Sequence, residues 1–150
     1  MKMIFILVCM LSLSACMRAD YDVIGKVDQS QKTVAMAPGG SRSVIAIKHK
    51  LREQGWTVLV LGNSVTSEVT GSEIVTRGSV HARYTLDVKL RQVDTCITGE
   101  AALIARAVLV DNKTNAEVFT YSASACEDDV AANITDLMNG TAPSKPKFSD

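Results

Sequence analysis

Residues 82–91 read ARYTLDVKLR and alternate apolar and polar side chains without a break. The apolar side chains occupy the even positions, and the polar side chains occupy the odd positions. Successive side chains of a strand point to opposite faces of a sheet, so the alternation predicts an antiparallel strand with one buried and one solvated face. This strand therefore belongs to a sheet that is covered on one side only.

Before this strand, the sequence predicts a strand, a helix and a second strand. Residues 33–37 (TVAMA) and 57–61 (TVLVL) are short apolar runs, which are typical of buried strands. The helix between them is capped by Ser41 or Ser43 and ends at Gly55. Its apolar face consists of Val44, Ile47 and Leu51. This order favours a parallel pair of strands joined by a right-handed crossover.

After the alternating strand, the sequence predicts two more strands and a final helix. Residues 100–110 are apolar and strand-like, and residues 117–125 form a further strand. The stretch between them, 111–115 (DNKTN), has the composition of a turn. The last helix begins at the acidic residues 127–129 and ends at Gly140.

The fold class follows from these elements. Residues 62–79 contain Ser, Thr, Gly and isolated apolar residues, and we expect a long loop there with room for one helical turn. The sequence predicts an α+β fold in two layers, with a mixed sheet of four to five strands and two helices in the order β-α-β-β-β-(β)-α.

Composition excludes several classes of protein. The chain has 150 residues, 47% of them hydrophobic, and its 16 basic and 16 acidic side chains give no net charge. Such a chain is too apolar for intrinsic disorder and lacks the basic surplus of a nucleic-acid binder. We therefore expect a folded domain with no nucleic-acid partner.

The N-terminus has the features of an export signal. Lys2 supplies a positive charge, and residues 4–13 form an apolar run that is too short to span a bilayer. The tetrapeptide Leu13-Ser14-Ala15-Cys16 ends this run and resembles the lipobox of bacterial lipoproteins. The resemblance implies cleavage before Cys16, anchoring in membrane lipid through acylated Cys16 and, because Met17 follows, an outer-membrane location. The domain would face the periplasm or the cell surface. The alternative is an ordinary secretory signal with a chance cysteine.

The chain then divides into four segments. These are a cleaved signal peptide at 1–15, a lipidated cysteine and tether at 16–32, a single α/β domain at 33–139 and a disordered tail at 140–150. The tether leaves room for one short strand around residues 21–24.

Two cysteines are expected to form a disulfide. Cys9 is lost with the signal peptide and Cys16 carries lipid, so Cys96 and Cys126 remain as a pair in an oxidising compartment. If the hairpin turns near Lys113, Cys126 comes close to the end of the preceding strand at Cys96. The alternative is a metal or redox pair, which would lack both a C-x-x-C spacing and a neighbouring histidine.

Motifs for catalysis are absent from the sequence. His49 is expected on the solvated side of its helix and His81 on the polar side of its strand, without an Asp, Glu or Cys at ligand spacing. The stretch 38–41 (PGGS) could cradle an anion, but a plain strand-to-helix turn is the simpler interpretation. The sequence therefore predicts no enzyme, no metal and no cofactor.

The polar face of the alternating strand is the candidate for partner binding. It carries Arg83, Asp87, Lys89 and Arg91. Alternating charges on a strand also describe a face that is merely solvated, and this alternative stays open.

Two stretches resemble recurring phrases of small envelope lipoproteins, namely residues 82–86 (ARYTL) and 108–118 (VLVDNKTNAEV). The families are activators of penicillin-binding proteins, curli-secretion-type lipoproteins and the N-terminal domain of the Tol-system propeller protein. Arg83 stands where those families have Asp, and Asn115 where they have Gly. The resemblance supports the predicted fold.

The expected function follows from the predicted anchor and domain. We expect a lipid-anchored envelope lipoprotein that acts by protein–protein interaction, as a scaffold, activator or assembly factor of an envelope complex. The alternatives are a protective lipoprotein of the surface-exclusion or immunity type and an envelope hydrolase.

Overall fold

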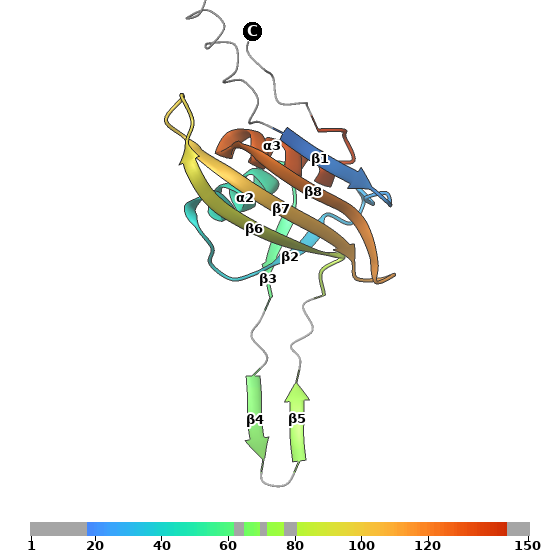
Figure 1. Cartoon of the computed structure of the whole chain (residues 1–150). Coiled ribbons are helices and arrows are strands. Elements are labelled where there is room, and N and C mark those ends of the chain that lie inside the picture. Colours follow the sequence, from blue (N-terminus) through green and yellow to red (C-terminus); the bar gives the residue numbers. More distant parts are fainter. Residues whose placement is uncertain (1–17, 62–64, 70–71, 77–80, 144–150) are drawn as a thin grey trace, which may run out of the picture.

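The computed structural model describes residues 18–61, 65–69, 72–76 and 81–143. The predicted signal peptide, Cys16 and the predicted tail from residue 144 onwards lie outside these ranges. The described residues form eight strands and two helices (Figure 1). In chain order they are β1 (Arg18–Val23), β2 (Thr33–Met36), α2 (Arg42–Glu53), β3 (Thr57–Val60), β4 (Val65–Val69), β5 (Ser72–Thr76), β6 (Tyr84–Thr95), β7 (Ala101–Asp111), β8 (Ala116–Cys126) and α3 (Glu127–Met138).

Six of the strands form one mixed sheet in the order β1-β8-β7-β6-β2-β3. Strand β2 pairs in parallel with β3 and β6, and the other neighbours are antiparallel. Figure 1 shows both helices on the same side of this sheet. The predicted α+β class and the parallel pair joined through α2 are therefore confirmed.

The alternating strand has the two faces that its sequence predicts. Within β6, Tyr84 and Leu86 are buried, whereas Asp87, Lys89 and Arg91 are exposed. The pleat separates the two sets because successive side chains point to opposite sides. The buried set faces the helices, and the charged set faces away from them.

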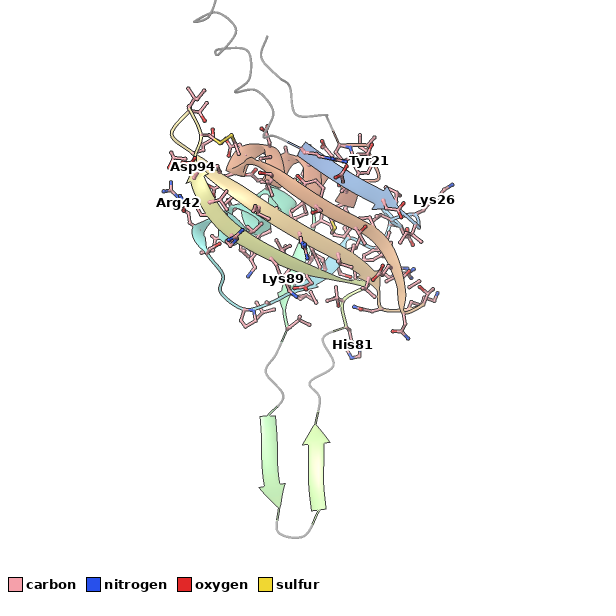
Figure 2. All side chains as sticks on the ribbon, viewed as in Figure 1. Tyr21, Lys26, Arg42, His81, Lys89 and Asp94 are labelled. Atoms are coloured by element: carbon pink, nitrogen blue, oxygen red, sulfur yellow. A yellow bond between two sulfur atoms is a disulfide. The ribbon has the colours of Figure 1, made fainter. Side chains whose placement is uncertain are left out.

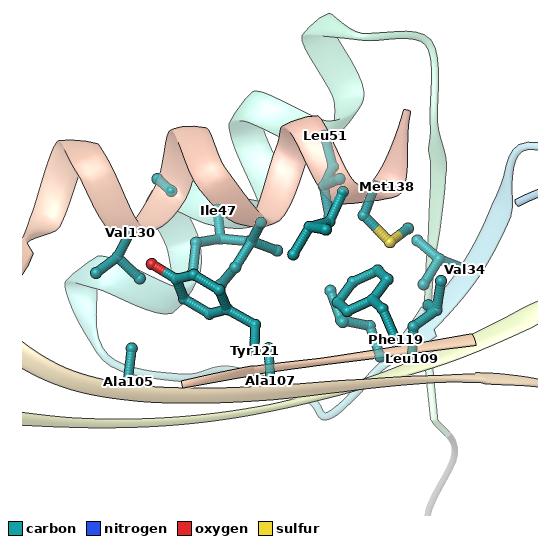
Figure 3. Close-up of a cluster of buried hydrophobic side chains, with 14 of the residues drawn as sticks. Val34, Ile47, Leu51, Ala105, Ala107, Leu109, Phe119, Tyr121, Val130 and Met138 are labelled. Atoms are coloured by element: carbon teal, nitrogen blue, oxygen red, sulfur yellow. The ribbon is translucent and has the colours of Figure 1, made fainter. Parts of the chain in front are cut away.

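The hydrophobic core lies between the sheet and the helices. Figure 3 shows side chains of both helices meeting side chains of β7 and β8 in this layer. Phe119 and Tyr121 are almost fully buried, and the amide of Asn133 on α3 donates to the Tyr121 hydroxyl at 3.3 Å. A register shift beside Leu109 lets β8 turn both Val118 and Phe119 inward. The largest fully buried side chains include Tyr84, Tyr121, Phe119, Met36, Ile47 and Leu51.

Helix α2 begins and ends where the sequence predicts. Ser41 is its N-cap, and Gly55 follows its last turn with a φ of +81°, a left-handed conformation that suits glycine. The chain then folds back, because the Trp56 amide donates to the Leu51 carbonyl at 3.0 Å. The Trp56 indole is buried and donates to the side-chain oxygen of Asn139 at 3.1 Å, which ties the ends of the two helices together.

Strand β1 extends the sheet beyond the predicted domain. It lies within the predicted tether and pairs along its length with β8, from Arg18 opposite Ser124 to Val23 opposite Phe119. The sheet therefore has six strands, rather than four to five. β1 has no clear hydrophobic pattern because it is an edge strand whose side chains are mostly exposed.

The predicted loop at 62–79 is wrong, because it contains two strands. Strands β4 and β5 form an antiparallel pair in which Val65 lies opposite Thr76 and Val69 opposite Ser72. They form a two-stranded sheet of their own. The β-branched residues of this segment suit a strand, although they do not alternate strictly with polar ones.

Candidate functional site

The candidate site is the side of the sheet that neither helix of the described residues covers, which we call the outer face. The register of four neighbouring strands aligns its side chains in rows across the sheet. One row runs from Lys89 on β6 through Arg106 and Ser122 to Asp20 on β1. The next row consists of Asp87, Val108, Thr120 and Asp22. The outer face thus carries Lys89 and Arg106 beside Asp87 near its middle. Along the β1 edge it carries Asp20 and Asp22, and Arg18 Nε lies 3.1 Å from Asp20 Oδ2.

The charged groups of the outer face are held only weakly by one another. Lys89 Nζ lies 3.6 Å from Asp87 Oδ2, and these side chains are 79% and 61% exposed. An ion pair this exposed contributes little to stability, typically below about 1 kcal/mol. Figure 2 shows Lys89 on β6, away from both helices. These charges are therefore available to a partner.

A shallow hollow of about 350 Å³ lies on the outer face over β7, β8 and β1. It is lined by Asp20, Tyr21, Asp22, Arg106, Ala107, Val108, Thr120, Tyr121 and Ser122. Ser122 and Arg106 lie directly opposite each other within it. The sequence analysis missed this hollow because its acidic side comes from β1, inside the predicted tether.

Arg83 lies apart from the other three residues predicted for partner binding. Its guanidinium donates to Asp111 Oδ2 at 2.6 Å, and the side chains of this pair are only 16% and 10% exposed. The same guanidinium lies over the Tyr84 ring, 5.5 Å from its centre. Arg83 directly precedes β6, and its ion pair with Asp111 links the start of β6 to the end of β7. The structure therefore brings Asp87, Lys89 and Arg91 together on one face and gives Arg83 a structural partner.

Asp111 is the residue that the sequence analysis missed at this position. Its Oδ1 accepts from the backbone N–H of Lys113 at 2.8 Å, as an aspartate commonly does at the start of a turn. Burial raises the pKa of the Asp111 carboxyl, but the Lys113 amide and the Arg83 guanidinium outweigh burial and hold this pKa below its ordinary value. Burial lowers the pKa of Arg83, and the hydrogen bond and charge of Asp111 turn the net shift upward.

The Asp111 carboxylate should make folding stability depend on pH. Because its pKa is lower in the folded state, its stabilisation is present above the unfolded value of about 4 and is lost as the pH falls through the folded pKa. We expect Asp111→Asn to lower the urea midpoint of unfolding at about pH 7 and to lower it less at about pH 3. Asp87→Asn, on the exposed outer face, is the matched control and should change neither midpoint. An Asp111→Asn deficit that is equal at both pH values would contradict this ion pair.

The predicted disulfide is present at one end of the sheet. Cys96 and Cys126 are bonded, with their Cα atoms 6.1 Å apart. Cys126 lies opposite Ala102 and ends β8 directly before α3, and Cys96 follows the last residue of β6. The bond therefore joins the turn between β6 and β7 to the start of α3.

The other sequence candidates take structural positions. His49 and His81 are both exposed, on α2 and before β6. Lys48 is buried, and its ammonium donates to the carbonyls of Ala37 and Gly39 at 2.7 and 2.6 Å. The turn before α2 thus presents carbonyl oxygens to a cation, which favours the plain-turn interpretation over an anion cradle. Within the described ranges, no three His, Cys, Asp or Glu side chains gather as metal ligands.

A second hollow, of about 530 Å³, lies between β1 and the end of α3. Its apolar lining includes Val23, Phe119 and Leu137.

Neither helix of the described part of the chain is long and apolar enough to cross a membrane.

This architecture, a six-stranded mixed sheet with two helices on one side, defines a two-layer α+β domain. No family model and no curated protein matches the sequence. Among solved structures, two crystal forms of the PelC dodecamer from Paraburkholderia phytofirmans are similar, each with a TM-score of 0.53 and 15% identity. Each match covers 85% of this chain and 99% of the PelC chain. TolB from Acinetobacter baumannii matches over 81% of this chain and 30% of its own, with a TM-score of 0.48 and 8% identity. At such identities the likeness to PelC shows the fold.

Proposed function

We propose that this protein is a lipid-anchored envelope lipoprotein that binds another envelope protein through the outer face of its sheet. It would serve as a scaffold, activator or assembly factor of an envelope complex. The observation that carries this proposal is the uncovered outer face. Antiparallel sheets do expose one face to water, but this face also presents charges without strong partners and a shallow hollow on a rigid sheet.

The lipid anchor in this proposal comes from the sequence. The tetrapeptide ending in Cys16 resembles a lipobox. Each CH₂ group of an acyl chain that is buried in the membrane contributes about 0.8 kcal/mol of binding free energy, so two or more chains anchor a protein stably. Met17 after the cysteine favours the outer membrane. Anchoring would confine the protein to a surface where its partner is also held, which raises the effective concentration of one for the other.

The charge pattern of the outer face describes the partner. Near the middle of the outer face, on β6 and β7, the basic side chains Lys89, Arg91 and Arg106 outnumber the acidic Asp87, while on the edge strand β1 Asp20 and Asp22 outnumber Arg18. A matching surface would carry acidic groups opposite β6 and β7 and basic groups opposite β1. Such complementarity steers encounter and sets specificity more than it sets affinity.

Reversing two basic charges of the outer face should abolish binding and leave the fold intact. For Lys89→Glu/Arg91→Glu we expect a change in unfolding free energy within about 0.5 kcal/mol, because both side chains are exposed. A partner captured by the wild-type protein from detergent-solubilised envelope should be lost with this variant. The wild-type capture should also weaken as salt is raised, because salt screens exposed charges.

The matched control reverses two basic charges elsewhere on the surface. Lys26→Glu/Arg42→Glu changes the net charge equally, and Figure 2 shows both residues away from Lys89. Capture of the same protein by this control supports the proposal. If the outer-face variant captures that protein as well as the wild type does, the outer face is not the binding surface. A captured species that proves to be a second copy of this chain would identify self-assembly, a state for which the PelC dodecamer offers a precedent on this fold.

A further inference from the structure

One end of the sheet brings together the start of β1 and the turn between β6 and β7. Arg18 begins β1 opposite Ser124, and Ala102 near the start of β7 lies opposite Cys126. The last residue of β6, Thr95, pairs with Ala101. In Figure 1 the turn from β6 to β7 and the start of β1 lie at the same end of the sheet. We call residues 93–100 the hairpin tip.

The hairpin tip exposes two large apolar side chains. Ile97 has a relative exposure of 108%, so nothing covers it, and Val93 is 47% exposed. Val93 is the extra residue of a bulge between Gln92 and Asp94. Turn positions usually hold Gly, Asn, Asp, Ser or Pro, so an uncovered isoleucine is unusual there. The hairpin tip therefore presents two apolar side chains, beside the exposed Asp94, that no other part of the described chain covers.

Backbone hydrogen bonds and the disulfide hold the backbone of the hairpin tip in place. The Cys96 amide donates to the Glu100 carbonyl at 2.7 Å, and the Gly99 amide donates to the Cys96 carbonyl at 2.9 Å. Gly99 has a φ of +87°, which closes the turn. The disulfide to Cys126 ties the turn to α3. This bracing fixes the turn from which the exposed Ile97 projects.

The length of the chain before β1 indicates what covers the hairpin tip. Cys16 precedes Arg18 by two residues, which span at most about 7 Å when extended. Three strand spacings separate β1 from β6, a distance of about 14 Å across the sheet. An acylated Cys16 would therefore hold a lipid surface within reach of this end of the sheet.

We propose that the hairpin tip rests in the lipid surface to which Cys16 is anchored, with Ile97 and Val93 inserted among the lipids. This inference depends on the lipidation of Cys16 in the proposed function. The start of α3 beside the tip is acidic, with Glu127, Asp128 and Asp129 in its first turn. An anionic surface would repel these carboxylates, so the inferred surface is zwitterionic phospholipid.

The contact would fix the orientation of the domain. With the start of β1 and the hairpin tip both at the membrane, the strands β1, β8, β7 and β6 run along the membrane normal. The outer face then stands upright beside the membrane. A partner anchored in the same membrane could meet it sideways.

The test places an indole at the hairpin tip of the full, lipidated protein. The variant Ile97→Trp is reconstituted in phosphatidylethanolamine–phosphatidylcholine vesicles with brominated acyl chains, which quench only an indole that contacts them. Trp56 is buried in the core and serves as the constant background. Val60→Trp is the matched control, because Val60 is 52% exposed on β3, the opposite edge strand from β1. Flotation of the vesicles reports the anchor separately.

The expected result is loss of most of the added emission and a blue shift for Ile97→Trp, with neither for Val60→Trp. The quenching should fall when anionic lipid replaces zwitterionic lipid. If the protein floats with the vesicles but the two variants are quenched equally, the tip contact is overturned and the anchor stands. If an aqueous quencher is excluded from position 97 while brominated lipid has no effect, protein covers the tip and the lipid contact is also overturned. If the wild-type protein fails to float, the proposed anchor itself fails.

Discussion

Replacing both bridged cysteines, as Cys96→Ala/Cys126→Ala, should lower the free energy of unfolding by about 3 to 4 kcal/mol. The bond spans a sequence separation of 30 residues, and closing such a loop removes conformational entropy from the unfolded chain. Most of the enclosed residues belong to the β7–β8 hairpin, so the bond also limits opening of the sheet at the start of α3. Urea denaturation of the oxidised protein and of the double variant measures the difference.

Both cysteines are replaced because a single substitution would leave a reactive thiol. Reductant is the control: it should bring the wild-type protein down to the level of the double variant and should leave the double variant unchanged. A loss below about 1 kcal/mol would mean that the bond constrains little of the unfolded chain.

The elements that could be predicted from the sequence are those whose signals are local. The two faces of β6 are predictable because even-numbered and odd-numbered residues of a strand point to opposite faces of the sheet. α2 is bounded by Ser41, whose hydroxyl accepts from the Val44 amide at 3.5 Å, and by Gly55, whose positive φ suits glycine. The disulfide was predictable because the hairpin turn fixes which residues of β7 and β8 lie opposite each other.

The elements that could not be predicted depend on distant partners. β1 (RADYDV) carries three charges in six residues, so the sequence allows only a short strand around 21–24 within a tether. The pairing with β8 makes all of 18–23 a strand. An edge strand has one hydrogen-bonded neighbour and mostly exposed side chains, so little hydrophobic pattern is required of it. β4 and β5 pair only with each other among the described strands, and their sequence does not alternate strictly between apolar and polar residues.

The part of the candidate site that lies on β6 was predictable from local alternation, and the parts that depend on strand pairing were not. Parity places Asp87, Lys89 and Arg91 on one face, and the structure keeps them there. Parity also assigns Arg83 to that face, but it says nothing of Asp111, which comes near only through the pairing of β6 with β7. Asp20 and Asp22 reach the outer face only through the pairing of β1 with β8, so the sequence analysis did not include them in the candidate site.

We expect Cys16→Ser to abolish lipidation, which leaves the protein either released from the membrane or uncleaved. A serine hydroxyl cannot form the thioether that joins a diacylglyceryl group to the cysteine, so the variant would lack every acyl chain. The hairpin tip alone offers two apolar side chains, Val93 and Ile97, which are too few to retain the domain in place of the two lipid signals that stable anchoring requires. Cell fractionation should find the variant outside the membrane fraction, or uncleaved with its signal peptide still attached.

Metabolic labelling with palmitate tests the lipid anchor, on which the account depends, most directly. The wild-type protein and Cys16→Ser are expressed side by side, labelled, immunoprecipitated and compared after membrane fractionation, with Cys9→Ser as the matched control inside the signal peptide. The account predicts label on the wild type and on the control, both in the membrane fraction, and no label on Cys16→Ser. Palmitate that persists on Cys16→Ser, or a wild-type protein without label, would contradict it.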